Sequence, residues 1–165
     1  MVNTASVSGR RTLSFATLDE FLRDAEALAA GGHRTLGNWT FGQILGHLAY
    51  AMHNSMDGFP FQAPWLVRYL VAPFVKNSAL TKPMKPGLKL PKSAAEYMPS
   101  ESLTVEEALA NCRRAVERLG NEIPSAKHPF FGVMASEEWM ALHLRHAELH
   151  LSFVVPDEAA AESAE

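Results

Sequence analysis

The sequence predicts an all-α protein built as a four-helix bundle. Three observations support this prediction: four segments repeat apolar residues at the helical period, each segment begins with a helix-start signal, and no segment between them alternates with the period of a strand. Helices of roughly 14–18 residues are long enough to form such a bundle. The 165 residues, 47% of them hydrophobic, are enough for one domain with its own core.

The first two helices are each predicted by a Thr followed three residues later by a Glu or Gln, the pattern of a capping box. Thr17 precedes an apolar stripe that ends at Gly31-Gly32, and glycine commonly ends helices. Thr40 begins the second helix, with Trp39 placed to pack against the following turn as a hydrophobic staple. Asp57-Gly58 ends this helix.

The third and fourth helices follow a long connection. Thr104 with Glu107 forms a third capping box, and Gly120 ends that helix. Ser136 is expected to begin the fourth helix, because two glutamates follow it in the first turn, where the helix dipole favours negative charge. This helix is expected to continue to about Phe153.

The predicted domain covers residues 14–156, between a loose N-terminus (1–13) and a disordered Ala/Glu tail (157–165). The second and third helices are joined by a crossover, residues 59–100, which contains seven prolines and six basic residues. One interpretation is a stiff connection that only spans the bundle. The other is a lid that packs its apolar residues over the ligand pocket and brings basic residues to an anionic substrate. The residues expected to form the apolar face of that lid are Trp65, Leu66, Tyr69 and Phe74.

Charge and composition exclude several classes of protein. A formal net charge of -3 and a pI of about 6.2 give no sign of nucleic-acid or membrane partners. The single cysteine, Cys112, suits a reducing compartment. No apolar segment follows Arg10-Arg11, so we expect no export signal and a cytoplasmic location.

Histidines provide the clearest indication of chemistry. Three of the seven, His143, His146 and His150, fall within one narrow stripe of the fourth helix, on its apolar side. Glu148 is expected on the opposite side. A buried imidazole needs a polar partner, and histidines four residues apart on a helix can share a metal ion. His47, between apolar residues of the second helix, also points toward the core, whereas His53 is expected at a rim or on the surface.

The residues alone leave two interpretations of these histidines open. They are metal ligands, or they are core histidines bonded to backbone carbonyls or to Tyr50. Cys112 could serve as a fourth ligand, although a small apolar role is the simpler interpretation.

Two segments resemble the DinB/YfiT-like superfamily. Residues 37–49, Gly-Asn-Trp-Thr-Phe-Gly-Gln-Ile-Leu-Gly-His-Leu-Ala, are similar to its second helix, and residues 139–153, with His-Ala-Glu-Leu-His-Leu, are similar to its last helix. His-Pro-Phe-Phe-Gly at residues 128–132 and the long crossover resemble one uncharacterised subfamily. The resemblance covers roughly residues 11–156.

This resemblance implies a DinB-like four-helix bundle with a divalent metal, commonly zinc or nickel, on a histidine triad of ligands. Matched residue by residue, the ligands are His47, His146 and His150, and His143 is an extra histidine. Relatives include transferases and an isomerase that use a low-molecular-weight thiol. We therefore expect a metal-dependent protein that activates a small thiol, as in thiol S-transferases.

Two alternatives remain, a metal-dependent hydrolase that activates water and a non-catalytic bundle that binds a metal or small ligand. His143 and Asn54 are the pocket residues that could assist catalysis. The expected partners are a small-molecule substrate and, as one option, a second copy of the chain in a homodimer.

Overall fold

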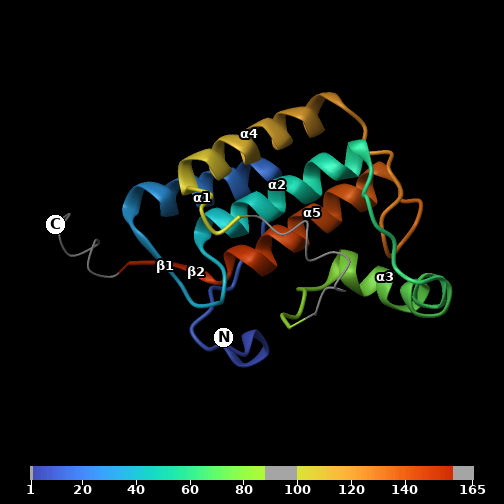
Figure 1. Cartoon of the computed structure of the whole chain (residues 1–165), viewed down its shortest axis with the longest axis horizontal. Helices are drawn as coiled ribbons and strands as arrows, with labels where there is room; N and C mark the ends of the chain where they lie inside the picture. The colour runs from blue at the N-terminus through green and yellow to red at the C-terminus, as the bar shows by residue number, and fades with distance from the viewer. Residues whose placement is uncertain (1, 88–99, 158–165) are drawn as a thin grey trace.

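The computed structural model describes residues 2–87 and 100–157, and this part of the chain is mostly helical. The four predicted helices are present as α1 (Leu18–Gly31), α2 (Phe41–Asp57), α4 (Val105–Asn121) and α5 (Ser136–Leu151). In Figure 1, α2 runs between α4 and α5, and it packs against both. Because α1 also contacts α4 and α5, each of the four helices has two neighbours among the others.

The starts of these helices agree closely with the sequence signals. Thr40 with Gln43 and Thr104 with Glu107 form both reciprocal bonds of a capping box. The Thr17 hydroxyl accepts a hydrogen bond from the Glu20 amide, while the Glu20 carboxylate accepts from Ala16 instead of Thr17. The N-cap of α5 is Ala135, one residue earlier than Ser136, and the Glu138 carboxylate accepts a hydrogen bond from the Ala135 amide.

One close approach explains a glycine at the start of α2. A Cβ atom at Gly42 would lie 2.1 Å from the carbonyl oxygen of Leu103, just before α4. Any side chain would therefore push the start of α4 away from α2. The apolar core continues from this contact between the helices, and its largest fully buried members include Phe21, Phe41, Leu45 and Leu48.

The sequence interpretation missed a small sheet. α5 ends at Leu151 rather than near Phe153, and β2 (Val154–Pro156) pairs antiparallel with β1 (His33–Thr35). Three-residue strands are too short to show a period-2 pattern, so the pairing depends on the tertiary fold. The sheet closes one end of the helical body, where Val154 is fully buried (Figure 1).

The N-terminal segment, expected to be loose, makes specific contacts in the structure. Thr4–Ser6 forms a 3-10 helix, η1. The Arg11 guanidinium makes two hydrogen bonds of 2.7 Å to the Asp24 carboxylate on α1. The Arg11 amide also donates to the carbonyl of Ser152 after α5. These are long-range contacts, which the local sequence of residues 2–13 does not reveal.

Part of the crossover is helical. A π-helical turn, η2 (Val67–Val71), leads directly into α3 (Ala72–Thr81), which packs against α5. Figure 1 shows α3 at the edge of the molecule, beside α5 and apart from α1 and α4. Residues 88–99 of the crossover and the tail from 158 lie outside the described residues. No helix in the described part is long and apolar enough to cross a membrane.

Candidate metal centre

Three histidines from two helices meet at one point. α2 supplies His47, and α5 supplies His146 and His150, one turn apart on the same face. One ligand atom from each ring lies within 4.8 Å of the other two. The Nε2 atoms of His47 and His146 are 3.1 Å apart. We call these three residues the histidine trio; it is the set that the sequence and the resemblance predicted.

Trp39 holds two rings of the trio in place. Its indole stacks on His150 with an interplanar angle of 6° and meets His47 edge to face, with ring centroids 5.4 and 5.0 Å away. Trp39 stands directly before the Thr40 cap of α2, so the start of this helix also sets the position of the indole. The contact restricts the rotation of both imidazoles, as the surroundings of a metal site commonly do.

Burial keeps the trio neutral at physiological pH. Removal from water lowers the pKa of His47 from 6.5 to about 4. It also lowers the pKa of His146 and His150 well below 6.5, and the neighbouring histidines lower both further. A neutral imidazole has a free nitrogen lone pair, which is the form that binds a metal ion.

A cavity of about 450 Å³ opens onto the trio. The wall on the side of the helical body includes Trp39, Ile44 and Phe153. Two further segments contribute to the wall: Thr4 from the N-terminal segment and residues 84–87 from the crossover. Lys85 is therefore a basic crossover residue at this cavity. Thr4 had no recognisable local signal, whereas Lys85 belongs to the crossover that the lid interpretation placed over the pocket.

His143 occupies a different environment from the trio, although it lies on the same helix. It is almost fully buried, its Nε2 is 3.1 Å from the Ser55 hydroxyl, and its ring stacks on Trp139. Burial lowers its pKa to about 4. Among the described residues, neither His143 nor Asn54 is part of the cavity wall. The Asn54 side-chain amide donates to the carbonyl of Tyr50 on its own helix.

The structure also shows the surroundings of three other residues discussed from the sequence. Cys112 is fully buried, its thiol donates to the Leu45 carbonyl, and burial raises its pKa to about 12, so it lies in the apolar core and not with the trio. His53 is partly buried and lies within hydrogen-bond distance of Asn111 and Arg118. Glu148 points away from the trio, but it is buried and accepts a hydrogen bond from the Phe15 amide.

The predicted apolar lid is wrong in its orientation. Residues 84–87 of the crossover do line the cavity, but Trp65, Leu66, Tyr69 and Phe74 face outward and are exposed. The reason is that the helix containing them packs against the body through its opposite side, which carries Ala72, Ala79 and Leu80. Of the crossover lysines, Lys76 forms an ion pair with Glu138, while Lys89 and Lys92 lie outside the described residues.

Comparison with known proteins identifies a family over nearly the whole chain. Residues 7–157 match the family described as Protein of unknown function (DUF1569). The searches of curated proteins and of solved structures found no match. The family match includes α1 to α5, both strands and the histidine trio. The chain therefore belongs to the DUF1569 family of proteins of unknown function.

Proposed function

We propose that the chain is a metal-dependent protein with a DinB-like four-helix bundle, formed by α1, α2, α4 and α5. In this proposal the histidine trio holds one divalent transition ion, zinc or nickel by the resemblance, and the protein activates a small thiol. The observation that carries the proposal is the convergence of three partly buried, neutral imidazoles beside a cavity.

The separation of the closest pair in the trio fits such an ion. Zinc–nitrogen bonds of about 2.0–2.1 Å at tetrahedral angles place two ligand nitrogens roughly 3.3 Å apart. The 3.1 Å separation of the His47 and His146 Nε2 atoms is close to this value. By contrast, His33 has an ordinary protein partner, because its Nδ1 lies 3.2 Å from the Leu28 carbonyl oxygen. The nitrogens of the trio face one another, which is the arrangement expected of ligands.

The protein side chains have distinct roles in this proposal. The trio supplies three neutral ligands, and Trp39 fixes the orientation of two of them. A divalent ion with an open position lowers the pKa of a bound thiol or water toward neutrality. The apolar part of the wall, including Ile44, Leu149 and Phe153, limits the access of water to this position. Lys85 offers a positive charge to a carboxylate or similar group of the substrate.

The composition of the cavity wall favours thiol over water as the activated group. Metal-dependent hydrolysis commonly uses a carboxylate as general base. No Asp or Glu belongs to the wall as far as the structure describes it. Glu148, the carboxylate nearest in sequence to the ligands, is bound by Arg145 and the Phe15 amide. A divalent ion held by the trio would make a bound thiol acidic enough to react without such a base.

The test combines metal analysis with two activity panels. We expect the untagged protein to carry about one zinc or nickel ion per chain, and His47→Ala and His150→Ala to lose it. The metal-loaded protein should then transfer a low-molecular-weight thiol to an electrophile in preference to hydrolysing esters or amides. Hydrolysis alone would select the hydrolase alternative, and full metal content with neither reaction would select the non-catalytic binding protein. Unchanged metal content in both variants would exclude the site.

A further inference from the structure

The surface of α3 and the turn before it is unusually apolar. Seven large hydrophobic side chains lie exposed within eleven residues: Trp65, Leu66, Tyr69, Leu70, Val71, Phe74 and Val75. Trp65 is 65% exposed, Tyr69 68% and Phe74 85%. We call these seven residues the outer face of α3. Contiguous exposed apolar surface of this kind commonly marks a site of interaction with a protein or a membrane.

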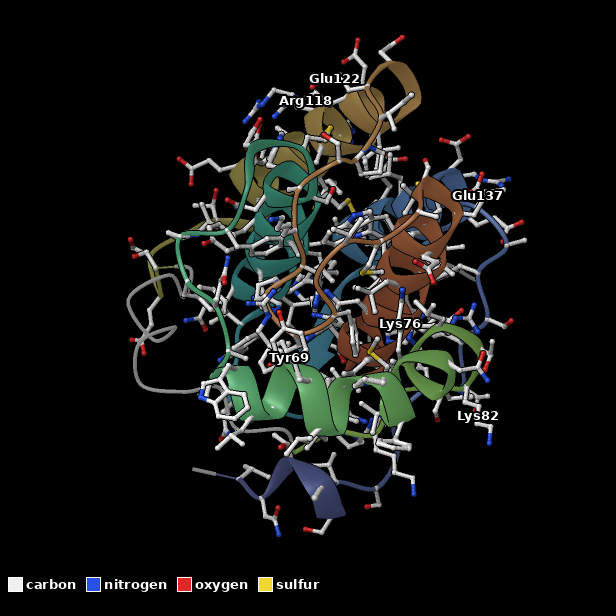
Figure 2. All side chains as sticks on the ribbon, turned by 90° about the vertical axis from the view of Figure 1, so that its right-hand side faces the viewer. Tyr69, Lys76, Lys82, Arg118, Glu122 and Glu137 are labelled. Carbon is white, nitrogen blue, oxygen red and sulfur yellow. The ribbon has the colours of Figure 1, made fainter. Side chains whose placement is uncertain are left out.

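The contacts of α3 with the body hold this face outward. Ala72 is buried, and Ala79 and Leu80 pack against the cluster around Trp139. On the same inner side, the Lys76 ammonium bonds to the Glu138 carboxylate of α5 at 2.7 Å. Figure 2 shows α3 crossing the front of the molecule, with Tyr69 near one end and Lys82 beyond the other. The exposure is therefore a consequence of how α3 is anchored, and turning the face inward would break these contacts.

The chain segment that contains the outer face carries basic residues and no acidic ones. Residues 59–87 contain Arg68, Lys76, Lys82 and Lys85 and no Asp or Glu. Beside Tyr69, a shallow pocket of about 300 Å³ is lined by the side chains of Arg68 and Lys127 and by residues 130–133. The Arg68 Nε atom is buried and has no hydrogen-bond partner in the described part of the chain. Two cations, one with an unused donor, thus border the aromatic side chains.

We propose that the outer face of α3 docks on an anionic phospholipid membrane, with a lipid phosphate in the pocket lined by Arg68 and Lys127. α3 would lie in the plane of the interface, with its aliphatic and aromatic residues among the acyl chains. Tryptophan and tyrosine favour this depth, because their rings are amphipathic. Lysine and arginine beside them add attraction to anionic headgroups. This inference does not depend on the metal site.

Charge favours a membrane over a second copy of the chain. In a two-fold symmetric dimer each face meets its own copy, so Arg68 and its basic neighbours would approach their equivalents. Like charges placed together in this way are repulsive. An anionic lipid surface instead complements the charge around the outer face. The net charge of the whole chain, -3, does not reveal this local positive charge, because acidic residues elsewhere in the chain outnumber the basic residues of this segment.

The test is co-sedimentation of the full chain with lipid vesicles at low salt. We expect binding to mixed phosphatidylglycerol–phosphatidylcholine vesicles, and much weaker binding to phosphatidylcholine alone. The double variant Trp65→Ser, Phe74→Ser should weaken binding by at least about tenfold, because each side chain buries a large apolar area. Both side chains are exposed, so the variant should keep the thermal unfolding midpoint of the natural chain.

Two matched variants separate a specific surface from general adhesion. Ile123→Ser removes another exposed apolar residue, 76% exposed, from a different place. Its neighbour Glu122 lies far from Tyr69 in Figure 2, so Ile123→Ser should bind vesicles normally. Lys127→Glu should weaken binding roughly fivefold or more. Arg23→Glu, an equal change of charge on α1, should have little effect.

The proposal is overturned by any of three results. The first is no binding to anionic vesicles at low salt. The second is an equal loss of binding in Ile123→Ser and in the double variant. The third is a concentration-dependent dimer in sedimentation velocity that the double variant abolishes, which would assign the outer face to a second copy of the chain.

Discussion

Two groups of histidines each have members on α5, but the groups differ in what their ring nitrogens contact. In the trio, His47, His146 and His150 face one another beside a cavity. One turn earlier, His143 faces the hydroxyl of Ser55 and stacks on Trp139. Burial lowers the pKa of the histidines in both groups. The comparison teaches that a lowered pKa is common to both groups and does not tell them apart, whereas the partners of the ring nitrogens do.

His128 belongs to the second group and strengthens the comparison. Its Nδ1 accepts hydrogen bonds from the amides of Phe130 and Phe131, and its ring lies 5.3 Å from that of Trp139. Burial, together with the nearby His143 and Lys76, lowers its pKa to about 3. His128 therefore has the partners of a structural histidine. It holds the turn before α5 against the aromatic residues.

The largest expected difference between the two groups is in metal affinity. His146→Ala should weaken zinc or nickel binding by more than about a hundredfold. Changing a residue that only supports a ligand weakens metal binding by up to about a hundredfold, and loss of a ligand itself should weaken it more. His143→Gln should leave the affinity within about threefold, because this side chain bonds to Ser55 and not to the trio. Competition with a chromophoric chelator measures both. Equal losses in the two variants would show that His143 is itself a ligand.

The next effect is on the pH dependence of folding. The pKa of His143 is about 4 in the folded chain and about 6.5 when unfolded, so between these values the unfolded state binds the proton. The stabilisation is thus complete above pH 6.5 and is lost as the pH falls toward 4. Over this range the metal-free chain should lose about 3 kcal/mol more than His143→Gln loses.

Urea unfolding at several pH values in metal-free buffer tests this difference. Parallel pH profiles of the natural chain and His143→Gln would mean that the pKa of His143 is the same in the folded and unfolded states.

A smaller effect is expected from the partner of His143. Ser55→Ala removes a hydroxyl that is fully buried, donates to the Met52 carbonyl and lies 3.1 Å from the imidazole. Leaving the buried ring unsatisfied should cost about 2 kcal/mol of unfolding free energy. Metal affinity should stay unchanged, since Ser55 does not contact the trio. A loss of metal in Ser55→Ala at unchanged stability would mean that the two groups are coupled.

The smallest effect is on the orientation of the ligands. Trp39→Leu removes the ring that stacks on His150 and touches His47, and it should weaken metal binding by about tenfold. The stoichiometry should remain near one ion per chain. Trp139→Phe is the matched control, because Trp139 stacks on His143 in the other group. Should both variants bind metal like the natural chain, Trp39 has no part in positioning the ligands.

Local sequence signals predicted the helices well, because the forces that begin a helix act within a few residues. The caps at Thr40 and Thr104 satisfy amides three residues away, so they are visible in the sequence. The same holds for His146 and His150, whose separation by one turn places them on one face wherever α5 lies. Their position on the apolar side of this helix could also be predicted.

Only the tertiary structure decided which distant residues meet. His47 and His146 are 99 residues apart in the chain, and their 3.1 Å separation depends on the packing of α2 against α5. The pairing of β1 with β2 and the arrival of Lys85 at the cavity have the same origin. The orientation of α3 was mispredicted because apolar residues lie on both sides of this helix, so that either side could pack against the core. The contacts of Ala72 and Lys76 select one of them, and these contacts exist only once α5 is in place.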